Sequence, residues 1–213
     1  MSVPTPRQAF AFLAPLRGRT SVFITPSRRR NSMVAHFLLG CLAASRMRTV
    51  IFDTSSFYAT NIGALAESLP KDFLQRSTLI TPQDDRRLED SVTDVLEMKA
   101  EAILIDDLNA LHYLISSDRR GGSGTHQLFT FIRLLSYQAR TENLFVFGTV
   151  YKTERDSAPE RTTRRSLSAA ADLQITTTGT TDRSDRISFR CTQTISGWPD
   201  NRFSAPLYLE PRT

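Results

Sequence analysis

Residues 102–107 read AILIDD, and this stretch decides the fold class of the chain. An apolar run that ends directly in two aspartates is typical of a central strand in a parallel sheet, because such a strand is covered on both faces and meets water only at its end. Two similar runs flank it along the chain, at residues 49–54 (TVIFDT) and 143–150 (NLFVFGTV). Their β-branched and aromatic residues also favour strands.

Helical patterns separate these strands. In residues 32–45, apolar side chains recur at the 3.6-residue spacing that places them on one helix face. Strands that alternate with such helices predict an α/β fold with a mainly parallel, twisted sheet flanked by helices. The predicted helices are residues 32–45, 61–69, 84–99 and 125–140, and the further strands are residues 21–25 (SVFIT) and 77–81.

The pattern changes after residue 150. Residues 151–165 are polar and charged without periodicity, which predicts a mobile loop. Short strands separated by turn signals then predict an antiparallel meander, at residues 173–178, 186–192 and 205–209. A length of 213 residues suits one sizeable domain. We predict a core domain of residues 17–213 after an N-terminal extension of residues 1–16.

The basic residues are almost all arginine. The net charge is +5, and lysine occurs only at Lys71, Lys99 and Lys152 among 27 basic residues. The planar guanidinium suits phosphate groups and base edges. A GC-rich genome would produce the same bias, so composition alone favours a nucleic-acid partner only weakly.

The chain shows no sign of a membrane or secretory destination. Its longest apolar stretch, around residues 37–44, is far shorter than a membrane span, and no signal peptide is evident. Cys41 lies in a helical pattern and is expected to be a buried hydrophobe, not half of a disulfide with Cys191. We therefore expect a reducing compartment, cytoplasmic or, in a eukaryote, nuclear.

The order of these segments resembles the ATPase core of the RecA/RadA recombinase superfamily, from about Arg17 onward. In that superfamily a strand enters a phosphate-binding P-loop and helix, a second strand ends in an Asp-Thr-Glu-like run, and an apolar strand ends in the Walker B aspartate. A long helix, another strand, a DNA-binding loop and a β-meander follow. The matching segments are FITPSRRRNS (23–32), VIFDTSS (50–56), AILIDD (102–107), the helix from Thr125, FVFGTVYK (145–152), and the loop and strands after it.

The resemblance implies a RecA-like P-loop NTPase core, but the P-loop position departs from the pattern. When G-x-x-x-x-G-K-[ST] is laid on residues 25–32 (TPSRRRNS), Thr25 and Arg30 replace the glycines and Asn31 replaces the lysine. A phosphate cradle needs glycines so that backbone N–H groups can approach, and it needs the lysine charge. Arginine side chains there would attract a phosphate but crowd a triphosphate. The degenerate P-loop residues are Arg28, Arg29, Arg30, Asn31 and Ser32.

Two further parts of the hydrolytic site are missing. The superfamily places an acidic residue after Asp-Thr to polarise water, but this chain has Ser55, which is no general base near neutral pH. No amide stands at the γ-phosphate sensor position, residues 148–150 (GTV). The Walker B-like pair Asp106 and Asp107 remains, either to bind Mg²⁺ beside a phosphate or to cap the following turn. We expect a pseudo-ATPase without metal or cofactor.

Two Arg-bearing segments match the superfamily's DNA-binding loops, residues 116–125 (SSDRRGGSGT) and 151–165 (YKTERDSAPERTTRR). Basic side chains on such loops would bind DNA in a salt-dependent, sequence-independent manner. Solvated loops of any Arg-rich protein have the same composition, so this alternative stays open. The candidate DNA-binding residues are Arg119, Arg120, Lys152, Arg155, Arg161, Arg164 and Arg165.

The resemblance therefore implies a non-catalytic RecA/RadA-like paralogue that acts in DNA recombination or repair. It would bind DNA, expected to be single-stranded, and/or a partner recombinase or another paralogue, as an accessory or mediator. Residues 10–14 (FAFLA) are only similar in character to the superfamily's adhesive motif, which leaves homo- and hetero-oligomers open. One alternative is an ATP-binding ATPase or nucleotide-regulated switch with an unorthodox P-loop. Another is a structural scaffold subunit without DNA contact.

Overall fold

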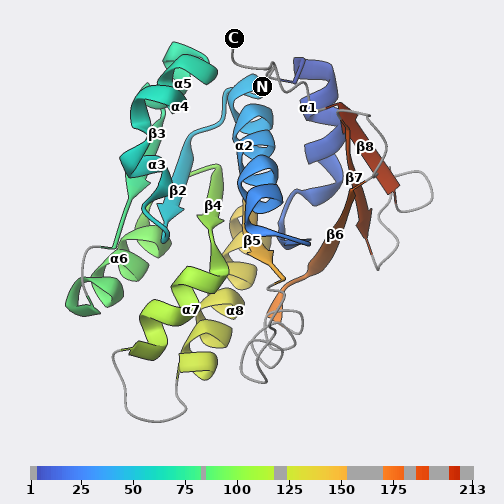
Figure 1. Ribbon diagram of the computed structural model, residues 1–213. Coiled ribbons are helices and arrows are strands. Elements are labelled where there is room, and N and C mark those ends of the chain that lie inside the picture. The colour runs from blue at the N-terminus through green and yellow to red at the C-terminus, as the bar shows by residue number, and fades with distance from the viewer. Residues whose placement is uncertain are drawn as a thin grey trace.

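The computed structural model describes residues 4–82, 85–117, 124–152, 170–179, 186–191 and 202–206. Their strands form one eight-stranded sheet in the order β3-β2-β4-β5-β1-β6-β7-β8 (Figure 1). The first six strands in this order are parallel, whereas β6, β7 and β8 pair antiparallel. The strands are β1 (Arg19–Thr25), β2 (Thr49–Asp53), β3 (Ser77–Ile80), β4 (Ala102–Asp106), β5 (Phe145–Tyr151), β6 (Leu173–Gly179), β7 (Arg186–Cys191) and β8 (Arg202–Pro206).

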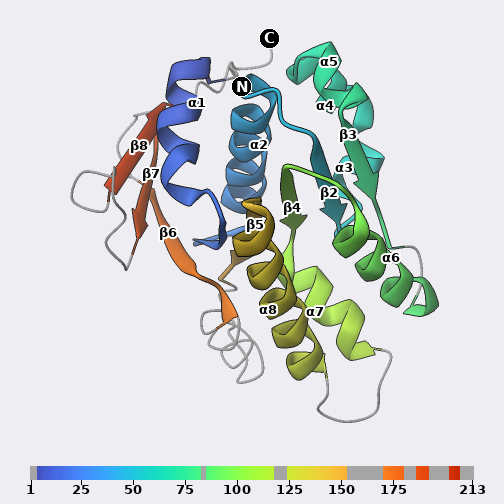
Figure 2. The ribbon, with the colours of Figure 1, turned by 180° about the vertical axis from the view of Figure 1, so that it is seen from behind.

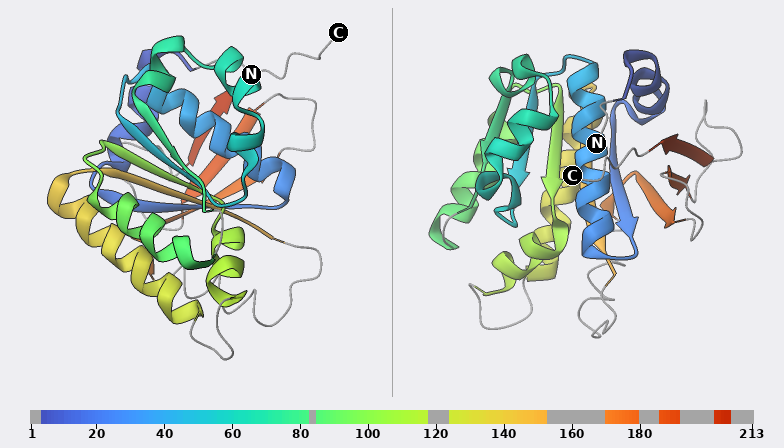
Figure 3. Two further views of the ribbon diagram at one scale, coloured as in Figure 1. Left: turned by 90° about the vertical axis from the view of Figure 1, so that its left-hand side faces the viewer. Right: turned by 45° about the horizontal axis from the view of Figure 1, so that its top comes forward.

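Helices cover both faces of the sheet. One layer holds α1, α2, α4 and α5, and the other holds α6, α7 and α8, which lie in front of the sheet when it is seen from behind (Figure 2). Figure 3 shows the sheet between the two layers. The helices are α1 (Pro6–Leu13), α2 (Arg28–Ala44), α3 (Phe57–Thr60), α4 (Ile62–Ser68), α5 (Lys71–Gln75), α6 (Asp85–Glu97), α7 (Leu108–Ser117) and α8 (Gly124–Glu142), with a 3₁₀ turn at Ala14–Leu16.

Each central strand contributes side chains to both hydrophobic cores, because successive side chains of a strand point to opposite faces. In β4, Leu104 packs toward the α2 layer, whereas Ile103 and Ile105 pack toward the α7–α8 layer. This is why AILI is apolar throughout instead of alternating. The predicted α/β class with a parallel sheet and an antiparallel C-terminal part is confirmed. Cys41 and Cys191 are both buried free thiols.

Several predicted boundaries were wrong. The last strand, β8 (Arg202–Pro206), begins three residues before the predicted start at residue 205, and it pairs with β7 from Arg202, opposite Arg190, to Pro206, opposite Arg186. Residues 207–209 of the predicted strand lie outside the described residues. Helices α1, α3, α5 and α7 were not predicted. The first three have at most eight residues, too few for a helical period to stand out.

The segment of residues 1–16, predicted as an extension, contributes a helix to the core. A capping box between Thr5 and Gln8 starts α1, and its Phe12 side chain is fully buried. The Phe12 ring lies 5.1 Å from that of Phe37 on α2 and 5.2 Å from that of Phe189 on β7, measured between centroids. Helix α1 therefore joins α2 to the C-terminal meander. Within the described residues, no helix combines the length and apolar character needed to cross a bilayer.

Replacing Phe12 with Ala should lower the free energy of unfolding by about 3–5 kcal/mol, because it leaves a cavity among packed aromatic rings. Chemical denaturation followed by circular dichroism measures this change. Phe10 on the same helix is 72% exposed, so Phe10→Ala is the matched control and should change stability by less than about 0.5 kcal/mol. Equal effects of the two substitutions would contradict the packing of α1 on the core.

Candidate functional site

The carboxyl ends of the central parallel strands bring polar side chains to one edge of the sheet. Asp53 at the end of β2 is level with Asp106 at the end of β4, and Thr149 near the end of β5 lies beside β1, which ends at Thr25. All four side chains are buried. In open α/β sheets this edge is where ligands bind.

The connection between β1 and α2 is too short to wrap a phosphate group. Only Pro26 and Ser27 separate the strand from the helix, which begins at Arg28 and not at Ser32 as predicted. The helix starts early because Ser27 caps it, with its hydroxyl accepting the N–H of Arg30 at 3.4 Å. The Asn31 N–H is also used, since it donates to the Ser27 carbonyl at 2.9 Å. The degenerate P-loop residues are thus the first turns of a helix.

The Asn31 side chain occupies the centre of the site. It is 2% exposed, and its Nδ2 donates to Asp106 Oδ1 at 3.1 Å and to Thr149 Oγ1 at 2.9 Å. The Thr149 hydroxyl in turn donates to Asp106 Oδ1 at 2.6 Å, and Thr25 Oγ1 lies 3.3 Å from Asn31 Oδ1. These side chains satisfy one another without any ligand, which buried polar groups require.

Burial raises the pKa of Asp106 to about 7, against the lowering effect of its hydrogen bond from Thr149. The neighbouring carboxyl groups of Asp107 and Asp53 raise this pKa further. The Asn31 amide donates one hydrogen bond to Asp106 and one to Thr149, but it carries no positive charge that would lower the pKa of Asp106. Burial and the neighbouring carboxyls therefore favour the protonated form of Asp106 more than in an exposed aspartate.

Asp107 has a different role, at the start of α7. Its Oδ1 accepts the N–H of Ala110 at 2.6 Å, and its backbone carbonyl accepts the Thr54 hydroxyl at 2.6 Å. Burial raises the pKa of the Asp107 carboxyl, and its backbone hydrogen bonds oppose that rise. The two Walker B-like aspartates are thus divided between the Asn31 network and a helix cap.

Asp53 caps the short helix α3. Its carboxylate accepts the N–H groups of Phe57 at 2.9 Å and Ala59 at 2.8 Å, and Ser55 donates its hydroxyl to it at 3.4 Å. Burial raises the pKa of Asp53 despite these hydrogen bonds. Ser55, at the position of the superfamily's catalytic acid, turns back onto Asp53.

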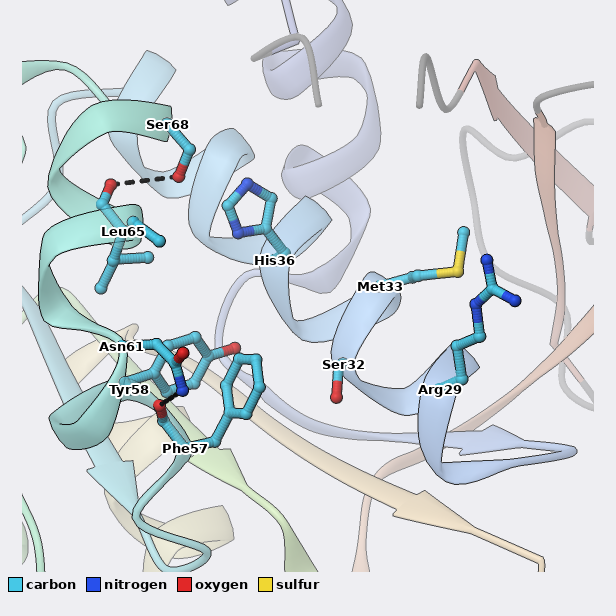
Figure 4. A pocket seen from close by; sticks show the side chains of 10 residues that line it. Arg29, Ser32, Met33, His36, Phe57, Tyr58, Asn61, Leu65 and Ser68 are labelled. Carbon is cyan, nitrogen blue, oxygen red and sulfur yellow. Dashed lines mark hydrogen bonds between the residues drawn. The ribbon is translucent and has the colours of Figure 1, made fainter. Parts of the chain in front are cut away.

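A cavity of about 480 Å³ opens beside this network, between α2 and the pair α3–α4 (Figure 4). Phe57 and Tyr58 form one side, Arg29 and Met33 lie at the other, and His36 stands between α2 and α4. No sequence pattern predicted this cavity, although Phe57, Asn61 and Leu65 recur at the four-residue spacing of a helix face. The lining residues are Arg29, Ser32, Met33, His36, Phe57, Tyr58, Asn61, Ala64, Leu65 and Ser68.

Of the candidate DNA-binding residues, the described part of the chain contains only Lys152. Its side chain is exposed, and its backbone N–H donates to the Thr25 carbonyl at 2.9 Å, so it lies at the carboxyl edge of the sheet. The described residues hold no group of three or more His, Cys, Asp or Glu side chains able to bind a metal ion. Arg119, Arg120, Arg155, Arg161, Arg164 and Arg165 lie outside the described residues.

Comparison with known proteins relates the chain to one fold. No protein-family model matches the sequence, and no curated protein matches it either. Among solved structures, the crystal structure of a RadB recombinase is similar, with a TM-score of 0.63 and 16% sequence identity over 89% of this chain and 87% of that one. The chain therefore has the RecA-like fold that its segment order predicts.

The Asp106 carboxyl should make stability depend on pH. Because its pKa is raised from 3.8 to about 7, the folded state keeps a proton that the unfolded state loses, so its contribution is full below about pH 4 and falls as pH rises to about 7. Asp106→Asn keeps the hydrogen-bond acceptor without the charge. Relative to wild type it should gain a few kcal/mol between pH 4 and 8, at about 1.4 kcal/mol per pKa unit.

Urea unfolding of both proteins across this pH range measures the difference. The comparison cancels the titrating groups that do not interact with Asp106, whereas any change in the coupled carboxyls of Asp53 and Asp107 is part of the measured difference. A difference that stays constant with pH would contradict the raised pKa of Asp106.

Proposed function

We propose that this chain is a non-catalytic protein of RecA-like fold that acts as an accessory in DNA recombination or repair. In this role it binds single-stranded DNA, a partner recombinase of the RecA/RadA type, or both, and it does not hydrolyse ATP. The observation that carries the proposal is the Asn31 network, in which a neutral side chain takes the place of the P-loop lysine and bonds to Asp106 and Thr149.

The chemistry of the network argues against triphosphate binding. Phosphoryl transfer relies on a lysine and on Mg²⁺ to neutralise the phosphates. Mg²⁺ is usually held by one or two ionised carboxylates, and burial raises the pKa of the Asp106 carboxyl, which disfavours its charged form. The backbone forms no phosphate-binding loop here, because residues 28–32 are the first turns of a helix, in which the N–H groups of Arg30 and Asn31 are bonded to Ser27.

The same network gives a physical reason why the fold could lose its nucleotide-binding residues. An empty nucleotide site would leave buried polar groups without partners, at a cost of about 1–3 kcal/mol each. Here Asn31, Asp106 and Thr149 satisfy one another, so the strand ends are stable without a nucleotide. A protein that keeps the fold but needs no nucleotide suits an accessory role.

The DNA role rests on the similarity to a RadB recombinase in fold and on the Arg-bearing segments of residues 116–125 and 151–165. Both segments follow elements that leave the carboxyl edge of the sheet, namely α7 after β4, and β5. Lys152, the first basic residue after β5, is exposed beside the end of β1. Basic side chains gathered at one edge would neutralise the phosphates of a strand.

ATP with Mg²⁺ should leave the melting temperature of the protein unchanged. A ligand that binds only the folded state stabilises it by mass action, by about 2.7 kcal/mol at one hundred times its Kd, so binding would be plain in a thermal-shift assay. An active RecA-type ATPase serves as the positive control. A rise in melting temperature that requires Mg²⁺ would instead favour the nucleotide-regulated alternative.

Replacing Arg164 and Arg165 together with Ala should weaken binding to single-stranded DNA and lower its dependence on salt. Each phosphate contact contributes about 0.7 to the slope of log K against log salt concentration, so the loss of two contacts should lower the slope by about 1.4. Fluorescence anisotropy with a labelled oligo(dT) over a salt series measures both quantities.

The charge-matched control replaces Arg17 and Arg19, which flank the amino end of β1 at the opposite edge of the sheet. This control should retain the affinity and the slope of wild type. Absence of any salt-dependent binding by the wild-type protein would leave the scaffold alternative.

A further inference from the structure

We propose that the outer face of α6 and α8 is a surface on which a second copy of this chain docks about a twofold axis. The two helices lie side by side in one layer, because the Gln138 amide of α8 donates to the Leu96 carbonyl of α6 at 2.7 Å (Figure 2). Such a dimer is independent of the DNA role, since it needs no nucleic acid. The face exposes opposite charges on its two sides and apolar groups between them.

The α6 side of the face is acidic. Asp90, Asp94 and Glu97 recur at the spacing that places them along one stripe of the helix, and all three are exposed. None of them forms an ion pair within the described residues. Val92 and Leu96 are half-buried against the core that α6 shares with α7 and α8. The acidic stripe therefore lies on the flank of α6 that faces away from α8.

The α8 side of the face is basic. Arg133 and Arg140 are seven residues apart, so they lie on one stripe of the helix, and both are exposed. Arg140 forms an ion pair with Asp172, which precedes β6, so this stripe faces away from α6. Arg133 forms no ion pair within the described residues. Except for its last residue, α8 contains no aspartate or glutamate, which leaves this flank positive.

Apolar side chains lie between the two charged sides. Leu134 is four residues before Gln138, so it lies on the flank of α8 that meets α6, and it is 49% exposed. Tyr137, which is 70% exposed, points outward from the next turn. The half-buried Val92 and Leu96 of α6 extend this apolar band. An exposed apolar patch with a charged rim is typical of a surface that binds another protein.

The opposite charges of the two sides favour a second copy as the occupant. A twofold axis through the apolar band places the acidic side of each copy on the basic side of the other, and it brings Leu134 and Tyr137 of both copies together. The same contact is thus made twice. DNA suits this face poorly, because its phosphates would be attracted by α8 and repelled by α6.

The size of the face suits a weak dimer. Helix α8 has 19 residues and is therefore about 28 Å long, and two packed helices are about 20 Å wide. A footprint of about 560 Å² on each copy buries about 1,100 Å² in the dimer, near the lower limit for specific interfaces. We expect a dissociation constant in the micromolar range.

Sedimentation velocity over a micromolar concentration series, without nucleic acid, measures the dimer. Leu134→Ala and Tyr137→Ala should each weaken it about tenfold, because they remove the apolar centre of the interface. The matched control is Phe10→Ala, which removes a 72% exposed ring from α1 in the other helix layer and should dimerise as wild type. Melting curves check that each variant is folded.

Charge reversal tests the twofold arrangement itself. Arg133→Glu makes both sides of the face acidic, and the pair Asp90→Lys and Asp94→Lys makes both sides basic, so neither protein should dimerise alone. An equimolar mixture should form heterodimers with the affinity of wild type, because each acidic side then meets a basic one. Lys71→Glu, an exposed change on α5 in the other layer, is the charge control and should leave the dimer unchanged.

Four results would overturn the proposal. They are a wild-type protein that stays monomeric at the highest concentration, a dimer that none of the α6 and α8 substitutions weakens, and charge variants that mixing fails to restore. The fourth is a mass that rises beyond the dimer with concentration, because a head-to-tail contact forms open chains. None of these results bears on oligo(dT) binding, which tests the proposed function separately.

Discussion

A neutral amide holds together the part of the molecule where a charged ligand would be expected. Asn31, near the start of α2, donates to Asp106 at the end of β4 and to Thr149 in β5, so it ties the helix to two adjacent strands at this edge. A lysine at this position would carry a buried charge that needs an anionic partner. With asparagine, the side chains of Asn31, Asp106 and Thr149 form hydrogen bonds with one another.

The acidic residues of this edge follow from that constraint. The Asp53 carboxyl raises the pKa of both Asp106 and Asp107, and the Asp107 carboxyl raises the pKa of Asp106, so ionising all three in one buried place costs free energy. Each of the three carboxyls instead has its own hydrogen-bond partners. Asp53 caps α3, Asp107 caps α7, and Asp106 shares its oxygen with Asn31 and Thr149.

These caps also shape the outer surface. Since Asp53 binds the N–H groups of Phe57 and Ala59, it determines where α3 starts and which way the Phe57 ring faces the cavity. The early start of α2 at Arg28 likewise turns Arg29 and Ser32 toward the same cavity. The residues at the polar edge of the sheet thus help to shape the neighbouring cavity.

The sequence by itself determined the class of the fold. Apolar runs such as AILI and helical spacing in residues 32–45 depend only on neighbours along the chain, and they predicted the parallel sheet and its order of elements. The departure from the P-loop pattern is visible directly in residues 25–32 (TPSRRRNS). The DNA-binding role of the basic residues in 116–125 and 151–165 stays a prediction. Among these candidates only Lys152 lies within the described residues, where its side chain is exposed.

Tertiary structure alone decided what Asn31 and Asp106 do. Asn31 and Asp106 are 75 positions apart, and their hydrogen bond exists only because β1 and β4 end at the same edge of the sheet. The cavity has the same origin, since Arg29 on α2 and Phe57 on α3 belong to helices that follow different strands. Periodicity reports which face of an element is buried, but contacts between distant segments depend on strand order and on where each helix begins.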